Sequence, residues 1–321
     1  MARSRGDHPL RIGTRGSPLA LAQAHELRDR LLAAHPHLAR AAIEIVVIKT
    51  TGDTVQNRTL AEIGGKGLFT KEIEEALAQG ELDMAVHSMK DMPTVLPDGL
   101  VIDCLLPRED PRDALFARSG GSLMTLPPAC IVGTASLRRA AQVKALRPDL
   151  TVVPLRGNVG TRLRKLADGE VGATLLAVAG LKRLGRQGEA TAILSTEEML
   201  PAVAQGAIGV ERRADDMATA ALLAPINDRE TAVRVAAERA CLAVLDGSCR
   251  TPIAALAELE GHLDQPGGTT LRLRALIAQP DGSVVHREER RGPASAAEAL
   301  GRAAGEALRS AGGPGFFHPA Q

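Results

Sequence analysis

Short β-rich runs and stretches of helical spacing alternate along the first third of the chain. Strands are predicted at residues 10–14, 43–48, 84–86 and 101–106, with helices after the first strand and around residues 69–77. Ser17 and Pro18 are typical of the cap and first turn of the first helix. Strands and helices joined by short loops predict an α/β fold with a mostly parallel sheet, which binds ligands at the carboxyl ends of its strands.

The pattern restarts after the polar, proline-containing stretch 108–113, which we interpret as a domain junction. Strands are predicted at 131–132, 152–153 and 173–178, and each ends in a Gly-, Ser- or Asn-containing loop with arginines. Residues 200–206 are interpreted as a return crossover and 207–211 as another strand. This repetition predicts a second α/β domain.

A different pattern, helix first and then strands, begins near residue 225. Asn227 and Glu230 predict a helix start, and Cys241 lies on the apolar stripe of that helix. Strands at 255–259, 271–277 and 284–288 precede a last helix with a cap at Ser295, so a small α+β domain is expected. The predicted domains are 1–106 with 207–224, then 107–206, then 225–321, with disorder after about residue 312.

Composition narrows the class of protein. The net charge is +1, and the 321 residues include four Phe but no Trp or Tyr, which argues against a nucleic-acid-binding module. No apolar run is long enough for a membrane span or a signal-peptide core. Four cysteines without metal-ligand spacing favour a reduced, cytoplasmic setting and no metal site.

Arginines and lysines recur near the predicted ends of strands and starts of helices. Helix N-termini attract anions, and a guanidinium group matches a carboxylate or phosphate bidentately. The chain has no P-loop and no dinucleotide fingerprint, so a polycarboxylate is the favoured ligand. Taken singly, each arginine is also compatible with an ordinary solvated surface charge.

Two residues stand out chemically. Asp91 is a carboxylate among cations, suited to stabilising a forming cation or to acid–base work; the alternative is that it pairs with Lys90 or caps the turn before Pro93. Cys249 lies on a loop beside Arg250, a cation that favours the thiolate, although a free cysteine often only fills space.

Seven stretches in order resemble the porphobilinogen deaminase family, also called hydroxymethylbilane synthases. They are TRGSPLA at 14–20, GGKGLF at 64–69, HSMKD at 87–91, SLRR at 136–139, LRGNVGTR at 155–162, AVAGLKRLG at 177–185 and the Cys249 loop. The resemblance runs from residue 10 to about residue 308. It implies two domains like those of a periplasmic binding protein, with a cleft between them, and a small third domain.

The resemblance also implies the chemistry. A covalent dipyrromethane cofactor joined to Cys249 by a thioether primes the addition of four porphobilinogen molecules, each losing ammonia, before hydrolysis releases hydroxymethylbilane. Asp91 is implied as the catalytic carboxylate, which binds pyrrole N–H groups and stabilises the azafulvene cation. The implied carboxylate-binding residues are Arg15, Ser17, Lys66, Lys90, Ser136, Arg138, Arg139, Arg156, Arg162 and Arg183. A monomer acting on this small molecule, with no nucleic-acid or membrane partner, is expected.

Three positions depart from the family pattern. Glu62 stands where some relatives have a lysine, Ala135 replaces a common serine, and Ser248 replaces a common glycine. None is Asp91 or Cys249, so only the contacts around Glu62 are placed in question. A non-catalytic binding protein for a carboxylated ligand is the rival hypothesis, although it gives Cys249 no purpose.

Overall fold

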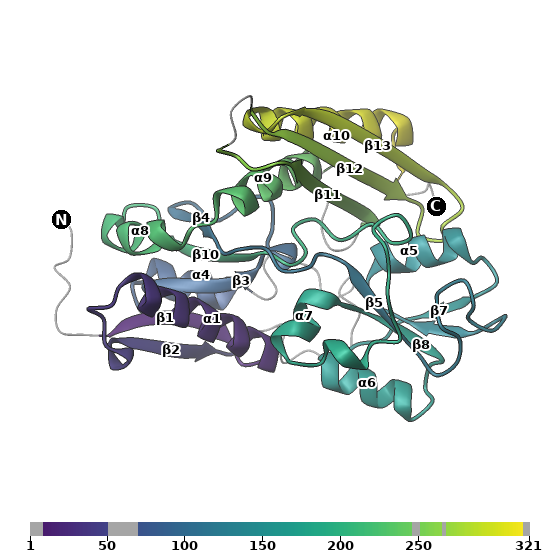
Figure 1. The fold of residues 1–321 in the computed structure, drawn as a ribbon, viewed down its shortest axis with the longest axis horizontal. Coiled ribbons are helices and arrows are strands. Elements are labelled where there is room, and N and C mark those ends of the chain that lie inside the picture. The colour runs from purple at the N-terminus through teal and green to yellow at the C-terminus, as the bar shows by residue number, and fades with distance from the viewer. Residues whose placement is uncertain (1–8, 51–69, 246–250, 265–267, 317–321) are drawn as a thin grey trace. The chain divides into compact units, whose positions relative to one another are not determined.

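The computed structural model describes residues 9–50, 70–245, 251–264 and 268–316 (Figure 1). The chain forms two compact units, residues 1–108 with 207–232 and residues 109–206 with 233–321. The first boundary falls between Arg108 and Glu109, inside the polar stretch predicted as a junction. The finer division into three domains stays a prediction.

A five-stranded mixed sheet organises the first unit. Its strands are β1 (Leu10–Arg15), β2 (Ile43–Ile48), β3 (Met84–Ser88), β4 (Leu100–Leu105) and β10 (Ile208–Arg213), in the order β2-β1-β3-β10-β4. β1 pairs in parallel with β2 and β3, and β10 is antiparallel to both β3 and β4. Four strands therefore run the same way, and only the returning strand β10 is reversed.

Helices cover both faces of this sheet, which confirms the predicted α/β arrangement. The helical elements are α1 (Pro18–Ala34), η1 (Arg40–Ala42), α4 (Lys71–Ala78), η2 (Met89–Asp91), α8 (Met217–Leu223) and η4 (Ala224–Ile226). The predicted stripe of α1 packs its buried residues Leu27 and Leu31 against Ile12 on one face. Ile73 and Leu77 of α4 form a second core on the other face.

The second unit repeats this strand layout. Its strands are β5 (Asp113–Ala117), β6 (Ile131–Gly133), β7 (Thr151–Val153), β8 (Ala173–Ala177) and β9 (Ala192–Ile193), in the order β7-β6-β8-β5-β9. Its helices are α5 (Leu137–Leu146), α6 (Val159–Ala167), α7 (Val178–Arg183) and the short η3 (Gln187–Glu189). β6 is parallel to β7 and β8, and the reversed strand is β5, antiparallel to β8 and β9. Both sheets thus place one reversed strand fourth in order.

One predicted loop of this unit is wrong. We expected an arginine-bearing loop after the strand near residue 178, but α7 begins at Val178 directly after β8. Val178 and Leu181 are buried in the adjoining core, and this burial favours the helix. Arg183 consequently lies at the C-terminal end of a helix.

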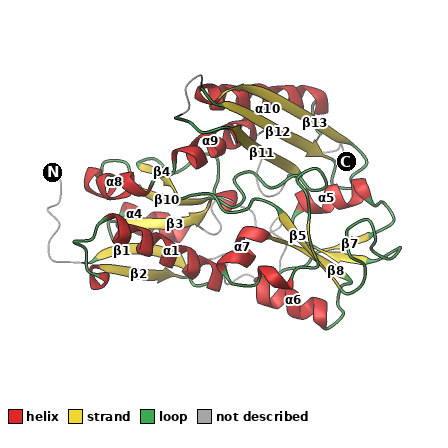
Figure 2. Cartoon of the chain, viewed as in Figure 1, coloured by secondary structure: helices red, strands yellow, loops and turns green. Residues whose placement is uncertain are grey.

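The C-terminal part is α+β, as predicted (Figure 2). It comprises α9 (Arg229–Val244), β11 (Ile253–Glu260), β12 (Thr270–Ala278), β13 (Val285–Pro293), η5 (Ala294–Ala296) and α10 (Ala297–Gly312), with the three strands antiparallel. α10 packs on β12 and β13. Beyond α10 the chain continues to Phe316, whose carbonyl accepts a hydrogen bond from Gln279 at 2.8 Å.

Both predicted helix starts in this part are wrong by one residue. Asp228 accepts from the Thr231 amide at 2.7 Å, whereas Asn227 instead accepts from the amide of Leu105. The N-cap of α10 is Ala296, which makes no side-chain cap bond, so Ser295 does not cap it. Asn227 is used for a tertiary contact that local sequence does not reveal.

Two glycines allow α10 to lie against α9. A Cβ atom built on Gly301 would overlap the Ala237 carbonyl oxygen, and one on Gly305 would lie 2.8 Å from the Cys241 carbonyl oxygen. Because both close neighbours are backbone atoms, they cannot move aside as a flexible side chain could. The two helices therefore pack backbone to backbone at these positions.

We predict that Gly301→Ala destabilises the protein. Alanine would raise helix propensity by about 1 kcal/mol, but overpacking against the α9 backbone should cost about 1–3 kcal/mol and lower the melting temperature. Ser310→Ala, at an exposed position of the same helix, is the matched control and should not lower it. A Gly301→Ala protein as stable as the control would contradict the close packing.

Candidate active site

A small pocket opens at the ends of strands β1 and β3 in the first unit. Its volume is about 70 Å³. It is lined by Arg15, Ser17, Leu19, Ala20, Gln23, Thr70, Val86, His87, Ser88, Asp91 and Met92. The structure thus brings three of the predicted site residues, Arg15, Ser17 and Asp91, into one pocket.

The β1–α1 connection supplies the cationic side of the pocket. β1 ends at Arg15, and the Ser17 hydroxyl caps α1 by accepting from the Ala20 amide at 3.2 Å. Pro18 occupies the first turn, as predicted. A guanidinium group and a helix N-terminus on the same wall attract an anion such as a carboxylate.

Asp91 is presented by a short rigid turn. η2 follows β3 directly, and the Met89 amide donates to the Ala207 carbonyl at 3.0 Å. Met89 and Met92 are buried on either side, while Asp91 is exposed. Within the described part of the chain, the Asp91 carboxylate has no hydrogen bond or ion pair, so the alternative that it serves as a partner for Lys90 is not observed.

Two polar pairs behind Asp91 were not predicted. His87 Nε2 lies 2.9 Å from Glu211 Oε2, and Gln23 donates to the Ser88 hydroxyl at 2.7 Å. Glu211 is fully buried on β10. The sequence carries a weak signal for this pair, a histidine and a glutamate each inside an otherwise apolar strand.

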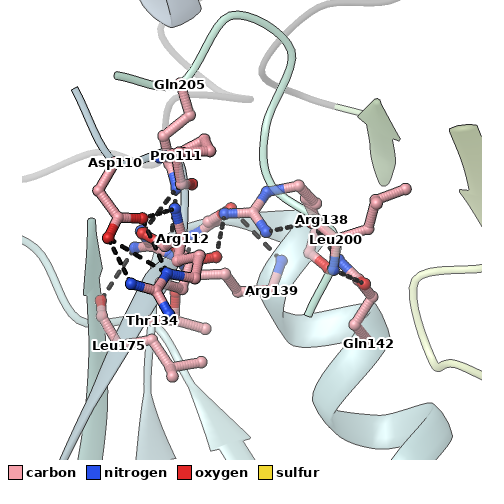
Figure 3. A network of polar contacts seen from close by, with 12 residues as sticks. Asp110, Pro111, Arg112, Thr134, Arg138, Arg139, Gln142, Leu175, Leu200 and Gln205 are labelled. Carbon is pink, nitrogen blue, oxygen red and sulfur yellow. Dashed lines mark hydrogen bonds and ion pairs between the residues drawn. The ribbon is translucent and has the colours of Figure 1, made fainter. Parts of the chain in front are cut away.

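The side chains of Arg138, Arg139 and Gln205 lie in one network of polar contacts (Figure 3). Their shared partner is a buried carboxylate, Asp113, at the start of β5. Arg139 donates to Asp113 Oδ1 from Nε and Nη2 at 3.2 and 2.7 Å, and Arg138 Nη2 lies 2.8 Å from Oδ2. Gln205 adds a hydrogen bond at 2.9 Å. Burial alone would raise the pKa of Asp113, but the two guanidinium charges and these hydrogen bonds outweigh it and hold the pKa well below its usual range.

Each of the two arginines also donates from Nη1 to a backbone carbonyl. Arg138 Nη1 donates to the Leu200 carbonyl at 2.7 Å, and Arg139 Nη1 donates to the Leu175 carbonyl at 2.9 Å. Both side chains are about 95 % buried. Arg138 and Arg139 therefore tie the start of α5 to β5, β8 and the return segment, and a role in binding ligand carboxylates stays a prediction for them.

Ser136 and Arg156 stand at the predicted helix starts. Ser136 caps α5 by accepting from the Arg139 amide at 3.4 Å, and Asn158 caps α6 by accepting from the Thr161 amide at 2.9 Å. Arg156, two residues before that cap, is half-buried and has no hydrogen bond or ion pair to any described residue. Its guanidinium group is consequently available to an external anion.

Three further predicted cations are engaged with the protein. Arg162 Nε donates to the Gly157 carbonyl at 2.8 Å, and Arg183 Nη2 donates to the Gly206 carbonyl at 3.1 Å. Lys90, in η2, also has a polar contact. Each side chain is partly exposed and retains its charge, so none is excluded as an anion-binding group.

Lys66, Glu62 and Cys249 lie outside the described residues. The other three cysteines can be compared. Burial raises the pKa of the Cys104 and Cys241 thiols to about 12, and Cys241 packs on its helix as predicted. Burial also raises the pKa of Cys130, which is partly exposed. Thiols with raised pKa values are poor nucleophiles.

The described part of the chain holds no group of three or more His, Cys, Asp or Glu side chains that could bind a metal ion. Among its helices, none combines the length and apolar character needed to cross a membrane.

Comparisons with known proteins cover almost the whole sequence. The family "Porphobilinogen deaminase, dipyromethane cofactor binding domain" matches residues 10–221, and "Porphobilinogen deaminase, C-terminal domain" matches residues 232–310. A porphobilinogen deaminase of Paracoccus denitrificans is 61% identical over 97% of this chain and 96% of its own length. A chloroplastic porphobilinogen deaminase of Oryza sativa is 55% identical over 97% of this chain and 86% of its own.

A solved structure, the methionine-binding protein MetQ, aligns with 70% of this chain and 91% of its own, with a TM-score of 0.42 and 12% sequence identity. This similarity is too low to add to the assignment.

We predict that Asp113→Asn destabilises the protein at neutral pH. The substitution keeps the shape of the side chain but leaves two buried guanidinium groups without a counter-charge, which should cost about 3–5 kcal/mol. The lowered pKa gives the sign of the pH dependence. The stabilisation is complete above the unfolded-state pKa of about 3.9 and is lost as the pH falls toward the folded-state value.

Urea unfolding at several pH values measures this effect, and the wild-type and Asp113→Asn curves should converge on acidification. Asp110→Asn is the control, because the Asp110–Arg112 ion pair is partly exposed and should contribute about 0–1 kcal/mol. Equal stability of the wild type and Asp113→Asn at pH 7 would refute the role assigned to Asp113.

Proposed function

Because the chain belongs to the porphobilinogen deaminase family, we propose that the pocket at Asp91 is where it performs the reaction of that family. The reaction is the stepwise condensation of four porphobilinogen molecules onto a dipyrromethane primer, with loss of ammonia, followed by hydrolytic release of hydroxymethylbilane. The enzyme is a transferase of tetrapyrrole synthesis. The rival hypothesis of a non-catalytic binding protein is set aside.

The Asp91 carboxylate, which has no partner among the described residues, is the observation that supports this proposal. It is exposed in a pocket whose wall also holds Arg15 and the N-terminus of α1. Porphobilinogen bears two carboxylates and a pyrrole N–H, so it needs a cationic wall and a hydrogen-bond acceptor. The pocket supplies both within one small volume.

Asp91 supplies a fixed negative charge where positive charge develops. Loss of ammonia from porphobilinogen leaves an electron-poor pyrrole ring, and a carboxylate held beside it lowers the energy of that state. Because η2 is anchored by buried Met89 and Met92, the carboxylate does not need to reorganise during the reaction. Arg15 and Ser17 hold the acidic substituents, so the substrate is oriented by its carboxylates.

The residues of the second unit fit an acidic dipyrromethane. Arg156 has no partner among the described residues and stands before the N-terminus of α6, an arrangement suited to a carboxylate. We assign the acetate and propionate groups to Arg156, Arg162, Arg183 and the capped start of α5 at Ser136, together with Lys66 and Lys90. When bound, the cofactor supplies the nucleophilic pyrrole carbon to which the first substrate is joined.

We assign the covalent attachment to Cys249. The Cys104 and Cys241 thiols are buried with raised pKa values and are poorly suited to forming a thioether. Cys249 follows α9 and precedes β11 in sequence, next to Arg250, whose charge favours the thiolate.

The broader setting is proposed on sequence grounds. Net charge near neutrality and the scarcity of aromatic residues support action on a small molecule without a nucleic-acid partner. We propose a cytoplasmic monomer with no membrane partner, organised in the three domains predicted from the sequence.

We predict that Asp91→Asn folds normally but loses turnover by about 10²-fold or more, because the amide keeps the size of the side chain and lacks its charge. Ammonia release from porphobilinogen and formation of hydroxymethylbilane measure the loss, and thermal unfolding measures the fold. Asp98→Asn, at another exposed carboxylate of the same segment, should retain turnover. Near-normal turnover of Asp91→Asn would remove Asp91 from the mechanism.

A further inference from the structure

A buried histidine–glutamate pair forms part of the Asp91 pocket. His87 lines the pocket, and its Nε2 atom lies 2.9 Å from Glu211 Oε2. The exposed fractions of the two side chains are 5% and 0%. His87 ends the buried part of β3, and Glu211 lies on the neighbouring strand β10.

The partner of Nε2 determines which ring nitrogen is left as the acceptor. An ionised carboxylate only accepts hydrogen bonds, so Nε2 must carry the proton that it donates to Glu211. In the neutral imidazole, Nδ1 then has a lone pair and no hydrogen. Nδ1 makes no hydrogen bond to any described residue, and the ring to which it belongs is part of the pocket wall.

Charged groups from the surrounding elements face this pair. Glu74 of α4 interacts electrostatically with both His87 and Glu211, and burial raises the pKa of Glu74. Arg15 of β1 and Asp91 of η2 line the same pocket, and α1 contributes the uncharged Gln23. Glu211 is therefore the carboxylate in hydrogen-bonding contact with the imidazole, and its charge should dominate the local effect on His87.

Strand pairing alone does not account for this pair. β3 and β10 are already joined by backbone pairing over five residues, including Ala85 with Glu211. Burying a carboxylate against an imidazole is costly, and apolar side chains of similar volume often stabilise a core at least as well. A pair retained at the wall of a reaction pocket is better explained by what it presents to the ligand.

We propose that His87 binds the aminomethyl group of porphobilinogen, which enters as an ammonium ion, through a hydrogen bond to Nδ1, and that Glu211 is the positioning residue that holds the required tautomer. This inference rests on placing the reaction at the Asp91 pocket. The acidic side chains of the substrate bind to cations, and the ammonium group requires an acceptor. His87 supplies that acceptor before ammonia leaves.

The first test compares pH profiles of kcat/KM for wild-type holoenzyme, His87→Gln and Glu211→Gln. Protonation of Nδ1 abolishes the acceptor, so wild-type activity should fall on the acidic side of the profile. Removing the Glu211 charge disfavours the imidazolium, so Glu211→Gln should move this acidic limb to lower pH by about half a unit or more. Glutamine at 87 can still donate to Glu211 but does not titrate, so this limb should disappear.

The second test measures ligand affinity without turnover. The probe is an analogue in which a methyl group replaces the aminomethyl group, used as a competitive inhibitor. His87→Gln should raise the KM for porphobilinogen about tenfold, in line with a lost hydrogen bond to a charged group, but leave the inhibition constant of the analogue unchanged. His25→Gln, at an exposed position of α1, should alter neither value.

Either of two results would overturn the proposal. One is an acidic limb with the wild-type midpoint in both variants, and the other is equal weakening of substrate and analogue by His87→Gln. Either result would mean that His87 shapes the pocket without contacting the amino group of the substrate. Asp91→Asn tests separately whether the reaction takes place at this pocket, and wild-type turnover tests the activity itself. Failure of the His87 proposal can therefore be distinguished from failure of the proposed function.

Discussion

An enzyme that holds a growing polycarboxylate must keep some of its cations away from its own acids. The structure divides its arginines accordingly. Arg138 and Arg139 are buried against Asp113, and their hydrogen bonds and ion pairs connect α5 to β5 and β8. Arg156, before the start of α6, is half-buried and has no partner among the described residues. Two of the arginines thus stabilise the fold of the second unit, and the pairing that does so leaves Arg156 out.

In the first unit, two acidic side chains differ in the same way: one is buried with a partner and the other is exposed. Glu211 is buried and joined to His87, whereas Asp91, in η2 after the adjacent strand β3, is exposed and has no partner among the described residues. A carboxylate already paired with a cation would have little charge left to stabilise a developing positive charge. Met89 and Met92, buried on either side of Asp91, carry no charge that would neutralise it.

The local sequence predicted most helices and strands. It also predicted the helix cap at Ser17, which depends only on residues close by in the sequence. Apolar periodicity located α1, all five strands of the first sheet and three strands of the second, but it missed β5 and the two-residue β9. The Ser17 cap was correct because its partner is three residues away. Contacts between distant residues were missed. Asp113 and Arg139 are separated by 26 residues and His87 and Glu211 by 124, so no local pattern reveals either pair. Nothing in the local sequence of Arg138 and Arg139 therefore indicated their ion pairs with Asp113.

Intact-mass spectrometry of freshly purified protein tests the central claim most directly. The wild-type chain should exceed its sequence mass by two pyrrole units and gain further units when porphobilinogen is added. Cys249→Ser should show the sequence mass alone, and Cys130→Ser should keep the adduct. Wild-type protein at its bare sequence mass, or an adduct that persists in Cys249→Ser, would contradict a primer held by that sulfur.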